Sequence, residues 1–217
     1  MSTHEIITLQ FGNYSNFVGT HYWNFHHKRL LEFENSTEDN RSYVTKLFRE
    51  SQSSRSCFVP RAIVFDIKSK LSSLKQDGSF GDTNEIAKEV LNNNSNAVIF
   101  DEPVIEKNQF VKQIQSGEVD PDANFECNFE SEVKTWTDFM SYEFDSHTVQ
   151  LLSETYKDGE DFSFFGIGQD EYKQLEDDFE DNLHFWAEEC DYLEGFQVFI
   201  VLVVIFDIID FGDTFLN

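Results

Sequence analysis

The hydrophobic and polar positions of this chain form short apolar runs separated by longer amphipathic segments, as strands and helices do. The first apolar run, Ile6–Phe11, has the length and the β-branched start of a strand that is covered on both faces. Gly12 ends this run, and the next segment places Val18, Tyr22 and Trp23 at i, i+4 and i+5 of a helix. The opening of the chain therefore predicts a strand, a tight turn and a helix.

Other apolar runs predict further strands of the same sheet. Phe58–Asp66 has a proline near its start, where a missing N–H is tolerated, and it ends in an acid. Another strand is expected to start after Gly195 and to run through Phe206, and weaker strands are expected at Thr148–Leu152 and Phe162–Phe165. Because strands and helices alternate, the fold class is α/β, with a mainly parallel sheet and flanking helices.

The clearest helical pattern covers Asp170–Leu193. Its apolar residues recur at spacings of three and four, which places them on one stripe facing a core. Shorter helices are expected at Ser69–Lys75 and Ser131–Phe144, and Glu32–Ser56 is expected to be a surface excursion with one helical turn. The residues of the long stripe are Tyr172, Leu175, Phe179, Leu183, Trp186, Cys190 and Leu193.

The length of the chain and the distribution of periodicity predict one domain. A chain of 217 residues can bury a substantial core, and residues 1–198 are expected to form it. Residues 82–130 lose periodicity and are rich in Asn and acids, so they are predicted to be a disordered insertion. Residues 199–217 are predicted to be a divergent apolar tail, as expected of a truncated or alternative end.

The charge of the chain limits the partners that it can have. The formal net charge is −25, from 16 Lys and Arg against 41 Asp and Glu, so the field of the protein repels nucleic acid and anionic lipid. The acidity indicates either a solvated surface or partners with basic or apolar patches. The longest apolar run has eight residues, which is too short for a transmembrane segment. Cys57, Cys127 and Cys190 form no C-x-x-C pair, which favours reduced thiols.

Histidines offer two weak candidates for chemistry. His21, His26 and His27 cluster on the first helix, but no cysteine or spaced acid completes a metal site, so we expect exposed histidines near a helix end. His184 and Glu188 share a helical face but provide only two ligands, and an ordinary surface pair is expected.

The stronger candidate site lies at the expected carboxyl edge of the sheet. Gly12, Asn13, Ser15 and Asn16 form the first turn, where backbone N–H groups and a helix N-terminus can meet an anion. Asp66 follows the second strand, where it could face magnesium or cap a helix. Farther along the chain, a Gly-x-Gly pair is either another phosphate loop or a plain strand-to-helix turn. The two residues of this pair are Gly166 and Gly168.

Three segments resemble tubulins in order and role. Glu5–Asn13 resembles their first strand and turn, Phe58–Asp66 their second strand, and Cys190–Gln197 the passage into their fourth. Within that superfamily the chain is most similar to the Misato family of tubulin-like proteins, over residues 5–81 and 131–198 but not over the insertion. The segments that carry this closer resemblance are Asn13-Tyr14, Leu71–Lys75, Phe165–Gln169 and His184–Leu193.

The resemblance implies a partial tubulin and FtsZ type of nucleotide-binding fold, related to the Rossmann fold. It also implies a cytoplasmic protein at the mitochondrial outer surface, held peripherally, that acts in mitochondrial distribution and morphology and in tubulin and spindle organisation, including chromosome segregation. The partners that it implies are tubulin or the cytosolic chaperonin complex. Neither nucleic acid nor a transmembrane segment is expected.

The chain departs from the tubulin pattern where a nucleotide would bind. Tyr14 replaces a small residue of the first loop, and Lys68 stands where another acid is usual. Apolar residues follow Gln197 in place of the glycine-rich phosphate loop of tubulins. We therefore expect no cofactor and no competent GTPase activity, with a GTP-binding form, whose nucleotide site is incomplete here, as the alternative.

Overall fold

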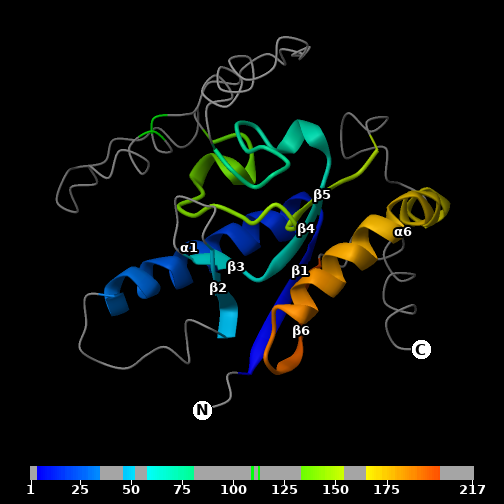
Figure 1. Cartoon of the computed structure of the whole chain (residues 1–217). Helices are drawn as coiled ribbons and strands as arrows, with labels where there is room; N and C mark the ends of the chain where they lie inside the picture. The colour runs from blue at the N-terminus through cyan, green and yellow to red at the C-terminus, as the bar shows by residue number, and fades with distance from the viewer. Residues whose placement is uncertain are drawn as a thin grey trace, which may run out of the picture.

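A four-stranded parallel sheet forms the centre of the computed structural model (Figure 1). Its order is β5-β4-β1-β6, and every neighbouring pair of strands is parallel. The predicted α/β class and the mainly parallel sheet are therefore confirmed. The strands are β1 (Glu5–Phe11), β4 (Ala62–Asp66), β5 (Val149–Leu151) and β6 (Leu193–Ile200). The structure describes residues 4–34, 46–51, 58–80, 109, 112, 133–153 and 165–200.

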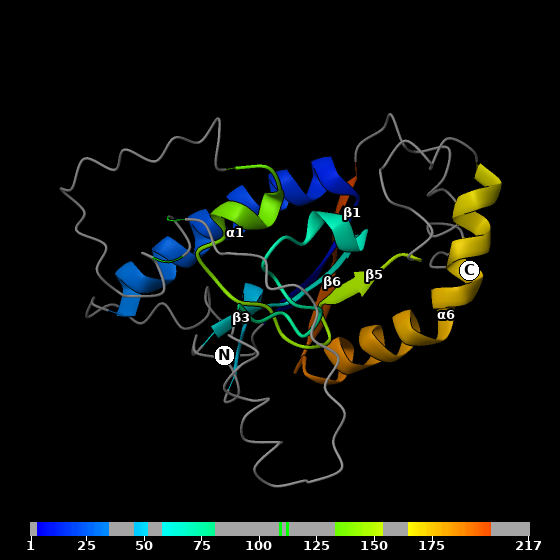
Figure 2. The same cartoon turned by 90° about the horizontal axis from the view of Figure 1, so that it is seen from above.

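Two long helices cover opposite faces of this sheet (Figure 2). They are α1 (Asn13–Glu34) and α6 (Phe165–Glu188). The alternation of side chains along β4 shows which helix covers which face. Val64 belongs to the same apolar cluster as Trp23 of α1, whereas Phe65 belongs to a second cluster with Phe179 and Trp186 of α6. Each face of the central strands is therefore buried, as the apolar runs predicted.

The buried face of α1 differs from the predicted one. Trp23 is fully buried and Tyr22 is partly buried, but the side chain of Val18 is 57% exposed. The hydrophobic pattern does not identify the buried side of α1, because that side is largely polar. Its buried residues recur at spacings of three and four, as on one side of a helix, but they include Asn, Thr and His. These buried residues are Asn16, Thr20, Trp23, His27 and Leu30.

The segment predicted as one strand at Phe58–Asp66 consists of two strands. Phe58–Pro60 forms β3 and pairs antiparallel with β2 (Phe48–Glu50), whereas β4 continues in the main sheet. Arg61 separates them: its N–H donates to the Leu47 carbonyl, and its own carbonyl accepts from the N–H of Thr8. The N–H of Arg61 thus bonds to the chain before β2 and its carbonyl to the main sheet. The hydrophobic pattern cannot show such a switch of backbone partners.

Both of the shorter predicted helices are wrong in extent. Of the predicted helix Ser131–Phe144 the structure describes residues 133–144, and these contain only the short 3-10 helix η2 (Trp136–Phe139), in which Thr135 and Asp138 form a capping box. At Ser69–Lys75 it contains the 3-10 helix η1 (Lys68–Lys70) followed by turns. The apolar residues of both segments are nevertheless buried, so tertiary packing uses them without an α-helix. These residues are Leu71, Leu74, Trp136, Phe139 and Met140.

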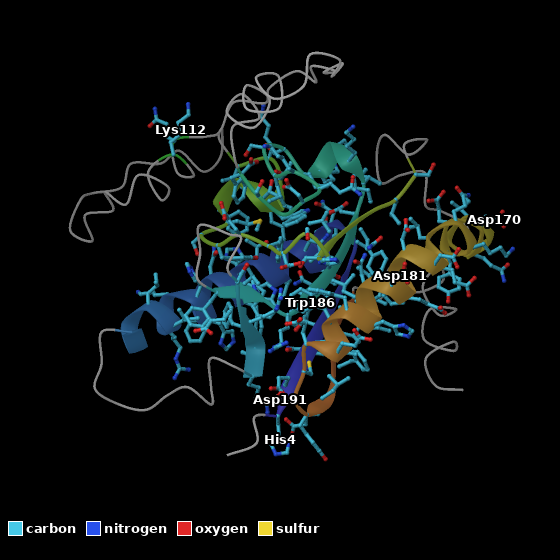
Figure 3. All side chains as sticks on the ribbon, viewed as in Figure 1. His4, Lys112, Asp170, Asp181, Trp186 and Asp191 are labelled. Atoms are coloured by element: carbon cyan, nitrogen blue, oxygen red, sulfur yellow. The ribbon has the colours of Figure 1, made fainter. Side chains whose placement is uncertain are left out.

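The long predicted helix is confirmed, with shifted ends. It begins at Phe165 and ends at Glu188, so Cys190 and Leu193 of the predicted stripe lie beyond it. Phe165 is helical and does not end a strand; residues 162–164 of that predicted strand lie outside the described residues. Figure 3 shows Trp186 directed toward the sheet, with Asp170 and Asp181 on the outer surface of α6.

Strand β6 lies at the edge of the described sheet. Its side chains alternate between partly buried and exposed, and Val198 and Ile200 are among the exposed ones. Gly195 lies inside this strand and does not separate it from the helix. The rest of the predicted strand, residues 201–206, lies outside the described residues, as does the predicted insertion apart from Gln109 and Lys112. Among the described helices none is long and apolar enough to cross a bilayer.

Gly78 and Gly12 provide a matched test of backbone packing. Both have positive φ, +79° and +81°. A Cβ on Gly78 would lie 2.6 Å from the Phe144 carbonyl oxygen, whereas a Cβ on Gly12 would meet nothing within 4 Å. We expect Gly78→Ala to lower the free energy of unfolding by about 3 kcal/mol, from φ strain plus the backbone clash. We expect Gly12→Ala to lower it by about 1 kcal/mol, from φ strain alone. Urea denaturation of both variants measures the difference, and equal losses would contradict this packing.

His27 predicts a dependence of stability on pH. Burial lowers the pKa of His27 from its ordinary value, and its Nδ1 lies 3.3 Å from the Ser141 hydroxyl. The unfolded chain therefore binds a proton more readily than the folded one, so stability is lost as pH falls below about 6.5 toward the lowered pKa. We expect the free energy of unfolding to fall across that window, and less steeply in His27→Gln.

A residual slope is expected in this variant, because burial and the charge of Arg29 also lower the pKa of His26. Urea denaturation at pH 7.5, 6.5 and 5.5 gives both slopes. Identical slopes for the wild type and His27→Gln would show that His27 is solvated.

Candidate functional site

The turn after β1 brings the start of α1 against the end of β4. The N–H of Gly12 donates to the Phe65 carbonyl at 3.1 Å, and the N–H of Asn16 donates to the Gly12 carbonyl at 3.0 Å, which closes the first turn of the helix. Glycine is required here by its positive φ and not by a close neighbour. The predicted first turn thus lies at the carboxyl edge of two adjacent parallel strands, where α/β folds bind ligands.

Asp66 is the charged group at the centre of this edge. Its Oδ2 accepts hydrogen bonds from Asn16 Nδ2 at 2.8 Å and from Trp136 Nε1 at 2.7 Å, and its Oδ1 accepts from the N–H of Ile67 at 2.8 Å. The side chain is buried, with 4% of its surface exposed. One carboxylate therefore ties together α1, β4 and η2.

The electrostatics of Asp66 follow from this burial. Desolvation raises the pKa of Asp66 from its ordinary value, whereas the donors of Asn16, Ile67 and Trp136 and the charge of Lys70 oppose the rise. An ionised carboxylate accepts at about four lone-pair positions, and protein donors occupy three of them here. A magnesium ion at Oδ2 would have to displace Asn16 or Trp136, and only one acceptor position of Oδ1 is left. The arrangement is that of a structural carboxylate.

The start of α1 contains polar atoms that the fold does not satisfy. Asn13 Oδ1, Ser15 Oγ and Asn16 Oδ1 are buried without a hydrogen-bond partner. Tyr14, the bulky residue of this turn, is 72% exposed and extends away from the protein. This turn therefore has free hydrogen-bonding capacity beside the backbone of α1.

Gly166 and Gly168 lie in a different place. Both are in the first turn of α6, so they form neither a loop nor a strand-to-helix turn. Near this end of the helix, Glu171 accepts a hydrogen bond from the N–H of Ser153, at 2.9 Å, just beyond β5. Strand β5 is separated from β1 by β4. The structure thus brings Gly12, Asn13, Ser15 and Asn16 together with Asp66, and places the glycine pair at the other end of that edge.

Trp136 is the site residue that sequence reasoning missed. Its spacing with Phe139 and Met140 predicted only a helix; it is a buried residue whose indole N–H donates to Asp66. A partner 70 positions away along the chain leaves no local signal. The sequence offers one general indication: a buried tryptophan N–H usually needs a hydrogen-bond acceptor.

The histidine cluster on α1 is not a metal site in the described part of the chain, where no group of three potential ligands occurs. His21 is exposed, as predicted, and its ring lies 4.6 Å from that of Phe139. His26 is partly buried and His27 is buried, so the prediction of exposed histidines is wrong for these two. The reason is that His27 faces the segment after η2, where it meets Ser141.

Comparison with known proteins agrees with this geometry. The profile of the Misato Segment II tubulin-like domain matches residues 4–116, more than half of the chain. The match includes residues 82–116, where the sequence analysis found no resemblance.

Several curated proteins are similar to the chain. Protein misato homolog 1 of Danio rerio is 29% identical over 233 residues, which cover 89% of this chain and 39% of that protein. The mouse protein of the same name is 27% identical and covers 89% and 38%. Protein misato of Drosophila melanogaster is 24% identical and covers 90% and 39%. The chain thus spans about two fifths of the length of these relatives.

The alignments with these relatives cover most of the chain. In the sheet, β1 lies between β4 and β6, as the resemblance to tubulins requires. The match of the domain profile to more than half of the sequence identifies the family: the chain belongs to the Misato family and carries its Segment II tubulin-like domain.

Proposed function

We propose that this chain is a non-catalytic tubulin-like protein that acts in mitochondrial distribution and morphology and in tubulin and spindle organisation. Its place would be the cytoplasm and the outer surface of mitochondria, held peripherally, and its partners would be tubulin or the cytosolic chaperonin complex. The cellular part of this proposal is supported by the resemblance to the Misato family. The non-catalytic part is supported by Asp66.

The use of Asp66 inside the fold is the observation that carries the non-catalytic proposal. Three N–H donors of the protein itself hold the carboxylate, and both donors to Oδ2 are side chains of other elements. In this proposal Asp66 serves the fold and the sheet serves as a scaffold. A scaffold needs the architecture of the tubulin fold but not its chemistry.

The segment after Gln197 supports the same proposal. Tubulins have their glycine-rich phosphate loop at this point, whereas here β6 continues through Ile200. Val198 and Ile200 pair in register with Leu9 and Phe11 of β1. The backbone groups that would cradle phosphate are therefore part of a strand.

A second candidate function is GTP binding without hydrolysis. The observation that favours it is the buried Ser15 hydroxyl at the start of α1, which has no hydrogen-bond partner and can donate to a phosphate; the unsatisfied Oδ1 atoms of Asn13 and Asn16 are acceptors and cannot. A helix N-terminus with free hydrogen-bonding groups attracts phosphate. Nucleotide would then bind through α1 alone, with Asp66 as a structural residue in either case.

The Asp66→Asn variant separates a structural carboxylate from a metal-binding one. An asparagine can accept from Asn16 and Trp136 through its oxygen, but its NH₂ group then faces the N–H of Ile67. We expect the free energy of unfolding to fall by about 1–3 kcal/mol, the cost of leaving a buried donor unsatisfied. Asp181→Asn, on the outer surface of α6, is the matched control and should be neutral.

Calorimetric titration of the purified chain with GTP and Mg²⁺ completes this test. We expect no heat of binding at micromolar GTP for either the wild type or the variant. Tight GTP binding that Asp66→Asn abolishes without loss of stability would refute the non-catalytic proposal. Binding that persists in Asp66→Asn would favour the second candidate.

The cellular proposal has its own test. We expect the tagged full-length protein to cofractionate with mitochondria, and alkaline carbonate to release it, because peripheral attachment depends on surface contacts. Immunoblotting of the pellet and the supernatant measures the release, with an outer-membrane protein that carbonate does not extract as control. A carbonate-resistant protein would contradict peripheral attachment, and a protein absent from the mitochondrial fraction would contradict the proposed location.

A further inference from the structure

The apolar side of the sheet that α6 covers continues onto β6, where it is exposed. Val198 pairs in register with Leu9 of β1, and the next pair on that side is Ile200 with Phe11. The two residues of β1 are 4% and 8% exposed and belong to the apolar cluster of α6. Their neighbours on β6, Val198 and Ile200, are 49% and 36% exposed. The cover that α6 provides therefore ends at β1.

The other side of β6 is covered by α1. The Tyr22 hydroxyl donates to Gln197 Oε1 at 3.2 Å, and the Tyr22 ring lies 5.3 Å from the ring of Phe199, centre to centre. From Phe196 onward, the exposed residues of β6 are all apolar. Sheets of α/β proteins have such a side covered by a further element.

The chain itself supplies a segment of matching chemistry directly after β6. Residues 201–217 lie outside the described residues, but their sequence has 11 apolar residues among 17, three aspartates and neither Lys nor Arg. From Val204 onward this sequence has the pattern of an amphipathic helix, with Phe206 as the exception. One side of the pattern contains Val204, Ile205, Ile208, Ile209, Phe215 and Leu216, and the other contains Asp207, Asp210 and Asp213. The strand predicted through Phe206 overlaps this pattern only at residues 204–206.

We propose that residues 204–217 of this chain fold back as an amphipathic helix and cover Val198 and Ile200 on the exposed side of β6. Three linking residues, 201–203, span about 10 Å, which is a common length for a connection between a strand and a helix. A helix over residues 204–216 is about 20 Å long. It therefore covers the roughly 13 Å from Phe196 to Ile200, and its aspartates face water. This inference does not depend on the proposed function.

The handedness of parallel connections favours the same side of the sheet. The connection from β5 to β6 runs over that side through α6, past β4 and β1. A connection that leaves β6 in the same direction, outward from β1, has the same hand only if it also runs over that side. Because nearly all such connections are right-handed, the chain after β6 is expected on the side that is exposed.

Two other occupants are less favoured. A second copy of the chain has the same net charge of −25, so the two copies repel each other. A partner protein must compete with a segment that three residues tether to β6. Such a tether gives an effective concentration on the order of millimolar.

Disulfide cross-linking in the full chain tests this proposal. Val198→Cys is combined with Ile205→Cys or Ile209→Cys, on the apolar side of the pattern. The matched controls combine it with Asp207→Cys or Asp210→Cys, on the polar side. We expect the faster isoleucine pair to form its disulfide at least ten times faster than either aspartate pair, because the bond requires Cβ atoms about 4 Å apart. Peptide mass spectrometry measures each link and distinguishes it from links of the native cysteines.

A mixture of two chains that differ in mass separates links within one chain from links between chains. Links mainly between chains would assign the side to a second copy and overturn the proposal. Equal rates for the isoleucine and aspartate pairs, or no link within one chain, would also overturn it. Circular dichroism confirms that each variant is folded.

A second measurement leaves the cross-link out. In the chain with Val198→Cys, maleimide labelling of the introduced thiol is followed by peptide mass spectrometry. Ile205→Asp, Ile209→Asp should speed this labelling at least tenfold, because charged residues cannot cover an apolar side. Asp207→Asn, Asp210→Asn is the matched control and should leave the rate unchanged. A rate that is the same in both double variants would contradict the proposed cover.

Discussion

The hydrogen bonds of the Asp66 carboxylate are the constraint on which the rest of the structure depends. Through Asn16 they fix the start of α1 against the end of β4, and through Trp136 they hold η2 on the same edge. A buried carboxylate is costly unless such donors surround it, so the three segments must reach their places together. The fold thus uses, as an internal joint, a group that α/β proteins commonly leave open to ligands.

The parallel sheet was predictable because its signals are local. The run after Arg61 is apolar on both faces, as a strand covered by two layers requires. The run Ile6–Phe11 is mostly apolar, and the spacing of Phe179 and Trp186 identifies α6 from the sequence alone. The extents of η1 and η2 were not predictable, because Thr137 there donates to the Leu71 carbonyl, a partner 66 positions away. Contacts of that range override local helical spacing, and they depend on topology that the pattern does not contain.

The candidate site divides in the same way. Gly12, Asn16 and Asp66 could be placed at one edge because parallel strands end together, and the structure does bring them into contact. What they do there could not be predicted, because it depends on Trp136. The buried side of α1 shows the same limit: Val18, whose spacing helped to predict the helix, is exposed, while Asn16, Thr20 and His27 are buried. A polar interior and an apolar exterior on one helix both contradict the usual pattern.

These two departures have one physical explanation. The inner side of α1 buries Trp23 and Leu30, and it also makes hydrogen bonds to the sheet and to the segment after η2, as Asn16 with Asp66 and Asn24 with Ser141 show. The outer apolar residues Tyr14, Val18 and Phe25 take no part in this core, and keeping them in water costs free energy unless something covers them. Natural proteins tolerate such a cost where a surface has a use. The polar inner side of α1 and its apolar outer side are therefore best understood together, as a helix fixed by hydrogen bonds and exposed for contact.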